Sequence, residues 1–151
     1  MKLKILIFIL AAIIGFAAYL FFNRSNPVLY RHVDRASAQY SAFLILNPFR
    51  DRKPERQAEV VLQRLQSRNY QQALSLASLD SERVTYLCER EQKYLLESWS
   101  LMDYQGDGKK VRLIYNLYRN SGDGEHLSPP AWIDVEKING EWQATSYETY
   151  Y

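Results

Sequence analysis

Three patterns of hydrophobic and polar residues follow one another along the chain, and each predicts a different kind of element. The first is the uncharged, almost wholly apolar run over residues 5–22. As an α-helix with a rise of about 1.5 Å per residue, this run would be roughly 27 Å long, close to the hydrocarbon thickness of a bilayer. Because a helix satisfies its own backbone hydrogen bonds in lipid, we predict a single-pass transmembrane signal-anchor over residues 1–23, in contact with the lipid bilayer through residues 5–22.

A cleaved signal peptide is the alternative interpretation of this run. Gly15 and Ala17 could be the small residues that precede a cleavage site. However, the apolar run continues from Tyr19 to Phe22, whereas the start of a mature secreted protein should be polar. The anchor is therefore the preferred interpretation.

The charges that flank the run bear on which side of the membrane the rest of the chain occupies. Lys2, Lys4 and the α-amine precede it and several arginines follow it, so the positive-inside comparison is nearly tied. A very short N-terminal tail with two lysines favours retention in the cytoplasm. We therefore expect the C-terminal domain in the periplasm or another extracytoplasmic compartment.

Residues 24–53 are predicted to form an amphipathic juxtamembrane helix and a charged hinge. Apolar residues recur there at helical spacing, until Pro48 and the sequence RDRKPER end the pattern. This helix could lie on the membrane, pair with a helix of another chain, or pack on its own domain. The residues expected to make membrane-proximal interactions are Arg24, Arg31, Arg35, Tyr40 and Phe43.

The second pattern, with apolar residues three and four positions apart, predicts helices from Pro54 to about Tyr94. Pro54 suits the first turn of a helix, and Asp80 or Ser81 can cap a later one. A looser stretch over residues 66–70 separates the first helix from the next. The predicted buried stripes comprise Ala58, Val61, Leu62, Leu65, Ala73, Leu74, Ala77, Val84, Leu87, Cys88 and Glu91.

From about Leu96 the period changes to two, which is typical of β-strands. Four such stretches predict an antiparallel meander, and its last turn is Asn139-Gly140, a pair that favours a two-residue hairpin loop. The apolar face of this sheet needs a cover, which the preceding helices provide. The predicted fold class is therefore α+β, with helices packed on a curved, cone-like sheet of four antiparallel strands over residues 54–151.

The same alternation predicts which side chains share a face of the sheet. With a two-residue loop, the hairpin pairs would be Lys137–Trp142, Val135–Ala144, Ile133–Ser146 and Trp132–Tyr147. In the first strand, one face would present Trp99, Leu101 and Asp103, and the other Ser98, Ser100, Met102 and Tyr104.

The formal net charge of +2 is unevenly distributed. Residues 24–68 contain nine Lys and Arg against four Asp and Glu, whereas residues 69–151 contain eight against thirteen. A basic stretch beside an anchor suits anionic lipid head groups or an acidic partner; a solvated, arginine-rich helix surface is the other interpretation. The sequence shows no groove-reading motif, which disfavours nucleic acid. The single cysteine, Cys88, excludes an intrachain disulfide and fits a small core residue.

Two stretches of the chain are informative. The first is a helix break at residues 65–78 (LQSRNYQQALSLAS), and the second is the last hairpin at residues 135–147 (VEKINGEWQATSY). Together with the order of helices and strands, they resemble the nuclear transport factor 2-like superfamily, which includes ketosteroid isomerase and the SnoaL-like cyclases. The resemblance covers residues 54–151 and implies a cone-shaped α+β domain. With its apolar N-terminal run, the chain looks most like envelope members of unknown function that are tethered to a membrane.

Enzymes of that superfamily place an acid–base carboxylate and a tyrosine inside the cone, which implies an interior ligand pocket here. The candidates for such a pocket are Trp99, Asp103, Tyr115 and Trp142. An aspartate in an apolar cavity would have a raised pKa and could transfer protons. Asp103, however, lies two residues from the QGDG turn, where a solvated carboxylate is the preferred interpretation. Neither histidine has metal-ligand spacing, and we predict no catalytic residue, metal or cofactor.

The anchor and the scarcity of acid–base residues predict a non-catalytic binding or assembly module of the cell envelope. A protein partner or a second copy of the chain is expected, because abundant tyrosines offer contact surface for either. A small-molecule ligand-binding protein, or an isomerase- or cyclase-like enzyme that uses the cone interior, is the alternative. A spacer within a larger envelope complex is a third interpretation.

Overall fold

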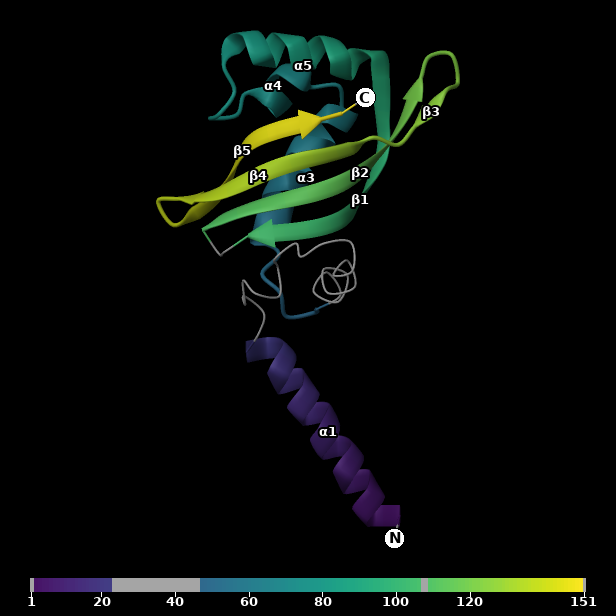
Figure 1. Cartoon of the computed structure of the whole chain (residues 1–151), viewed down its shortest axis with the longest axis vertical. Helices are drawn as coiled ribbons and strands as arrows, with labels where there is room; N and C mark the ends of the chain where they lie inside the picture. Colours follow the sequence, from purple (N-terminus) through teal and green to yellow (C-terminus); the bar gives the residue numbers. More distant parts are fainter. Residues whose placement is uncertain (1, 23–46, 107–108, 151) are drawn as a thin grey trace.

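The computed structural model describes residues 2–22, 47–106 and 109–150 (Figure 1). Helix α1 (Lys2–Phe22) precedes helices α3 (Lys53–Gln66), α4 (Tyr70–Leu74) and α5 (Ser81–Lys93). The strands are β1 (Tyr94–Gly106), β2 (Lys110–Ser121), β3 (His126–Leu127), β4 (Pro130–Ile138) and β5 (Glu141–Thr149). The predicted α+β class is confirmed, because an apolar N-terminal helix precedes helices packed on a curved antiparallel sheet.

Helix α1 exposes large apolar side chains along most of its length, and it is long and apolar enough to cross a membrane. Its last turn contacts the residues that lead into the α+β domain. Asn47 Nδ2 donates a hydrogen bond of 3.1 Å to the Leu20 carbonyl. The rings of Phe21 and Phe49 meet edge to face, with centroids 5.8 Å apart. These contacts place the C-terminal end of α1 beside the start of the domain.

Helix α3 packs on the sheet through the predicted apolar stripe, which is buried from Ala58 to Leu65. Its start is fixed by Arg50 and Glu55, whose side chains are both almost fully buried with Nε and Oε1 2.6 Å apart. Pairing is what makes burial of these two charges tolerable. The helix contacts β1, β2, β4 and β5, so it is the main cover of the sheet.

Helices α4 and α5 extend this cover on the same side of the sheet (Figure 1). Asp80 caps α5, because its Oδ1 accepts a 2.7 Å hydrogen bond from the Arg83 N–H. Helix α4 ends at Leu74. Ala77, which the sequence placed on a buried stripe, is therefore beyond the helix and exposed.

The four long strands lie in the order β1-β2-β4-β5, all antiparallel, and the short β3 pairs with β2. The meander closes at the predicted turn, where Asn139 and Gly140 both have positive φ, 52° and 88°. These are the backbone angles that a two-residue type I′ hairpin loop requires.

The register of this hairpin was predicted correctly only next to the turn. Lys137 pairs with Trp142 and Val135 with Ala144, but a bulge between Asp134 and Val135 shifts every later pair by one residue. The extra residue on β5 is Thr145, whose carbonyl accepts a 2.9 Å hydrogen bond from Ser78 N–H in the α4–α5 connection. This contact is made to a residue outside the hairpin, and alternation alone could not reveal the bulge.

Beyond the bulge, Ile133 faces Tyr147 and Trp132 faces Glu148, in place of the predicted partners Ser146 and Tyr147. Tyr147 thereby turns into the core, where it is fully buried. Trp132 stays on the opposite face and meets Tyr150 edge to face, with ring centroids 4.7 Å apart.

Strand β1 begins at Tyr94 and contains two register shifts, between Leu96 and Ser98 and between Leu101 and Asp103. The second shift makes the predicted face of Asp103 wrong. Leu101 pairs with Tyr115 on the helix-covered face, whereas Asp103 pairs with Ile114 on the opposite face. Tyr104, predicted on the outer face, is buried instead.

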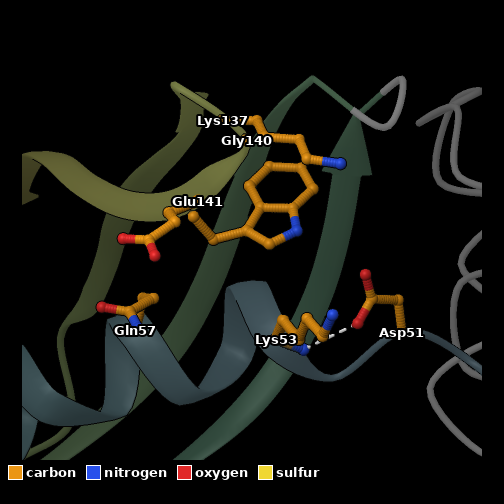
Figure 2. Close-up of a pocket in the computed structure, with 7 residues that line it drawn as sticks. Asp51, Lys53, Gln57, Lys137, Gly140 and Glu141 are labelled. Carbon is orange, nitrogen blue, oxygen red and sulfur yellow. Dashed lines mark hydrogen bonds between the residues drawn. The ribbon is translucent and has the colours of Figure 1, made fainter.

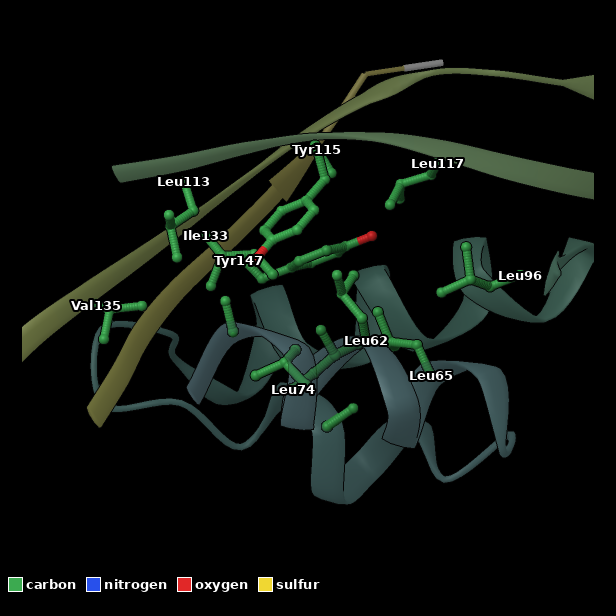
Figure 3. Close-up of a cluster of buried hydrophobic side chains, with 14 of the residues drawn as sticks. Leu62, Leu65, Leu74, Leu96, Leu113, Tyr115, Leu117, Ile133, Val135 and Tyr147 are labelled. Atoms are coloured by element: carbon green, nitrogen blue, oxygen red, sulfur yellow. The ribbon is translucent and has the colours of Figure 1, made fainter. Parts of the chain in front are cut away.

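The core lies between the sheet and helix α3 and is filled by side chains from both (Figure 3). Tyr115 and Tyr147 extend from the sheet toward Leu62 and Leu65 (Figure 3). Burying each leucine contributes roughly 1.5–3 kcal/mol, so this interface is the main source of stability. The predicted cone interior is occupied here by large side chains of the protein itself.

Candidate functional site

The four residues predicted to line an interior pocket lie in different environments. Tyr115 is fully buried in the core, and Trp99 is half-buried against it. Asp103 lies on the other face of the sheet, where its Oδ1 accepts from Tyr104 N–H at 2.8 Å and its Oδ2 from Gln105 Nε2 at 2.9 Å. Trp142 lies at the hairpin end, beside a different cavity. The four residues therefore do not form one site.

The hydroxyl of Tyr115 is a polar atom within this apolar core. It is buried and makes no hydrogen bond to the residues that the structure describes. Burial raises the pKa of Tyr115 well above its ordinary value, and the charges of Glu59 and Glu55 raise it further. The phenol is therefore a neutral donor. Burial likewise raises the pKa of Glu59, with Glu55 adding to the shift.

At the α5 end of the core, three polar side chains form what we call the buried ionic cluster: Glu91, Arg119 and Tyr147. Arg119 Nη2 lies 2.6 Å from Glu91 Oε2, and neither side chain is accessible to solvent. Tyr147 Oη donates to Glu91 Oε1 at 2.9 Å and accepts from Arg119 Nη2 at 3.1 Å. Arg119 Nη1 also donates to the Tyr94 carbonyl at 2.9 Å, where α5 turns into β1.

The buried ionic cluster ties α5, β2 and β5 together. Because its charges are paired and hydrogen-bonded without solvent, it is suited to a structural role. Cys88 lies nearby and its pKa is raised by burial and then by the charge of Glu91. A thiol in that setting stays protonated at neutral pH, which does not favour a nucleophile.

At the opposite end of the domain, the β4–β5 turn and the start of α3 enclose a cavity of about 360 Å³ (Figure 2). We call it the hairpin-end pocket. Lys53 N–H donates to Asp51 Oδ1 at 3.0 Å and so orders its helix side. The lining residues are Asp51, Lys53, Gln57, Lys137, Gly140, Glu141 and Trp142.

The hairpin-end pocket presents charges of both signs around a tryptophan. Lys53 and Lys137 contribute ammonium groups, and Asp51 and Glu141 contribute carboxylates. Trp142 is 9% exposed and its indole can only donate. Such a set suits a small ligand that carries both a negative and a positive group.

Sequence reasoning identified Trp142 as a pocket residue but grouped it with residues of the cone interior, and it did not identify the remaining residues of this pocket. Asp51 and Lys53 belong to the stretch that was predicted as a charged hinge. Their meeting with the hairpin turn depends on how α3 crosses the sheet, which no local pattern encodes. The available signal was a tryptophan beside a tight turn, flanked by Lys137 and Glu141.

The outer sheet face, which is turned away from α3, carries exposed apolar and aromatic residues. Met102, Tyr118 and Tyr150 are 56%, 43% and 61% exposed, and Ile114 and Trp132 are partly exposed. Beside them, Arg112 holds Asp134 in a two-pronged ion pair, with distances of 2.6 and 2.8 Å. Hydrogen bonding to Asp134 raises the pKa of Arg112.

The predicted membrane-proximal residues Arg24, Arg31, Arg35, Tyr40 and Phe43 lie outside the described residues. In the described ranges, no group of three or more His, Cys, Asp or Glu side chains is arranged to hold a metal ion.

No protein-family model matches the chain, and no curated protein matches it either. Among solved structures, it is similar to a designed nuclear transport factor 2-like protein, with a TM-score of 0.51 and 10% identity over 66% of this chain and 97% of that one. At such low identity the likeness concerns the fold alone, and it supports the resemblance inferred from the two sequence stretches.

Two further structures align less well. A SEC-C motif-containing protein from Rhodopseudomonas palustris gives a TM-score of 0.49 at 13% identity, over 74% of this chain and 90% of that one. The intermembrane space region of the chloroplast protein ARC6 gives a TM-score of 0.40 at 12% identity, over 68% of this chain and 98% of that one.

Proposed function

We propose that the chain is a membrane-anchored, non-catalytic binding or assembly module of the cell envelope, with its α+β domain on the extracytoplasmic side. The observation that supports this most is the joining of an exposed apolar helix to a domain whose core is filled by its own side chains. The lipid bilayer would hold α1, and binding would take place on the surface of the domain.

The outer sheet face is the surface that best suits a protein partner or a second copy of the chain. Aromatic residues and methionine are enriched at the centres of protein interfaces. Here Met102, Tyr118 and the Trp132–Tyr150 pair lie on one face together with the Arg112–Asp134 ion pair. An apolar surface with a fixed charge pair can give both affinity and orientation.

Photo-crosslinking in intact membranes tests this proposal. A photoreactive phenylalanine analogue at Tyr118 should give a discrete adduct with a second protein or with another copy of the chain. The same analogue at Tyr86, which is similarly exposed at 45% but lies on α5, is the matched control. Recovery of the chain in the soluble fraction, or an uncrosslinked monomer with both analogues, would contradict the proposal.

A ligand-binding or isomerase-like role for the cone interior is the second candidate, and one observation favours it. The Tyr115 hydroxyl is buried without a partner among the described residues, and Glu59 and Glu55 affect its pKa. A tyrosine donor near carboxylates is a suitable pair for binding a carbonyl compound. Ligand screening by thermal shift tests this role: a hit whose stabilisation disappears in Tyr115→Phe would support it.

A further inference from the structure

We propose that the hairpin-end pocket binds the head group of a phospholipid that carries both a phosphate and a primary ammonium, the phosphoethanolamine class. This inference rests on the proposed function, because it assumes that α1 holds the domain at a bilayer. It goes beyond that function by assigning a ligand to one site. The support comes from an indole donor that lines the pocket, from the charges around it, and from the position of the pocket relative to α1.

The donor is the indole N–H of Trp142. The side chain is more than nine-tenths buried and lines the cavity. Among the residues that the structure describes, the indole N–H has no hydrogen-bond acceptor. The nitrogen retains access to solvent, so a phosphate oxygen in the pocket could accept a hydrogen bond from it.

The charges around the tryptophan match both halves of this head group. Lys53 and Lys137 can donate to phosphate oxygens, and the N-terminus of the 14-residue helix α3 adds its positive end. Asp51 and Glu141 can accept from a primary ammonium, which offers three N–H donors. In the described ranges, none of these four side chains forms an ion pair with another protein residue. A trimethylammonium group has no N–H and would leave both carboxylates unsatisfied.

The pocket wall at the start of α3 follows closely on the residues that contact α1. Asn47 and Phe49 contact Leu20 and Phe21 in the last turn of α1. Lys53 follows Phe49 by four residues, a reach of at most about 14 Å for an extended chain. The head-group layer of a leaflet is about 5–8 Å thick, so with α1 in a bilayer the Lys53 side of the pocket would lie within reach of that layer. In Figure 1, α3 begins on the side of the domain nearer α1, and α5 lies on the far side.

The test uses the full chain in nanodiscs, with the indole ¹H–¹⁵N resonance of Trp142 as the readout. Trp142→Phe assigns that resonance among the three tryptophans. Replacing phosphatidylcholine stepwise with phosphatidylethanolamine should shift the Trp142 resonance progressively and saturably, leaving those of Trp99 and Trp132 in place. Phosphatidylglycerol, which has the phosphate without the ammonium, should shift it much less.

Matched variants test whether a negative and a positive side chain of the pocket both contribute to head-group binding. Glu141→Gln and Lys137→Gln should each weaken the lipid dependence about tenfold, because each removes a charge-assisted hydrogen bond to the head group. Glu89→Gln and Lys93→Gln, at exposed positions of α5, should not change it. Unshifted resonances of Trp99 and Trp132 would show that each variant is folded.

Two results would overturn the assignment. One is an equal response to all three lipids, and the other is a response to phosphatidylethanolamine that Glu141→Gln leaves unchanged. Membrane fractionation of the same variants separates this inference from the proposed function. If they remain in the membrane fraction without a head-group response, only the head-group site is wrong; if the full chain is soluble, the proposed function fails as well.

Discussion

The two ends of the helix–sheet interface use polar side chains in opposite ways. At the α5 end, Glu91, Arg119 and Tyr147 are joined by an ion pair and hydrogen bonds in a cluster closed to solvent. At the hairpin end, Trp142, Lys137 and Glu141 surround a cavity and leave donors and acceptors available to a ligand. Polar side chains at a core boundary can thus either fix the fold or prepare a binding site, and the pairing of their charges distinguishes the two.

The largest expected effect comes from breaking the buried ionic cluster. Arg119→Met would leave the carboxylate of Glu91 buried without its cation, which should lower the free energy of unfolding by about 3–5 kcal/mol. Lys110→Met, which removes one partner of the exposed Lys110–Glu136 pair, is the control and should cost less than about 1 kcal/mol. Thermal unfolding of the full chain in detergent, followed by circular dichroism, measures both. Equal effects would show that the cluster is not structural.

A smaller loss of stability is expected from Tyr147→Phe. This change removes a hydroxyl that bonds to both Glu91 and Arg119, so the free energy of unfolding should fall by about 1–3 kcal/mol. The same thermal unfolding experiment measures it. A value near zero would mean that the two charges alone make the cluster stable.

Tyr115→Phe should have the opposite sign, although the two tyrosines lie in one core. Its hydroxyl has no partner among the described residues, so its removal should leave stability unchanged or raise it by up to about 1 kcal/mol. Destabilisation by more than about 1 kcal/mol would indicate that the hydroxyl forms a hydrogen bond in solution.

Cys88 reports on the α5 end through its reactivity. Because burial and Glu91 raise its pKa, the folded protein should react with iodoacetamide more slowly than the urea-unfolded chain, and its rate should rise only at higher pH. Measuring the alkylation rate against pH for both states tests this sign. If the pH midpoint of alkylation in the folded protein were at or below that of the unfolded chain, the raised pKa of Cys88 would be contradicted.

The smallest effect on stability is expected at the hairpin end. Lys137→Gln and Glu141→Gln change exposed groups that form no ion pair with described residues, so the free energy of unfolding should change by less than about 0.5 kcal/mol. The same thermal unfolding experiment applies. A loss comparable with that of Arg119→Met would mean that polar side chains at both ends are structural.

The sequence predicted the fold well wherever local periodicity determines structure. The apolar run became α1, the stripe from Ala58 to Leu65 is buried, and Asn139-Gly140 forms the predicted turn. These features depend on residues close together in the chain. The α+β class followed because the period changes from helical to alternating at the point where α5 meets β1.

The bulges were not predictable, and they account for the errors at the candidate sites. An extra residue at Thr145 moves Tyr147 into the core, and the shift near Met102 moves Asp103 out of it. Alternation predicts a strand's faces only until its first irregularity, which tertiary contacts such as Ser78 N–H to the Thr145 carbonyl determine. Glu91 on an apolar helix stripe was the one visible sign of a buried partner, and Arg119 near a strand end gave none.

Hydrogen–deuterium exchange of the full chain in nanodiscs tests the contrast between the two ends most directly. When phosphatidylethanolamine replaces phosphatidylcholine, backbone amides around residues 53–57 and 137–142 should exchange more slowly. Those of Glu91, Arg119 and Tyr147 should be strongly protected in both lipids and should not change. Protection that changes at the α5 end, or not at all at the hairpin end, would contradict the division into a structural end and a lipid-binding end.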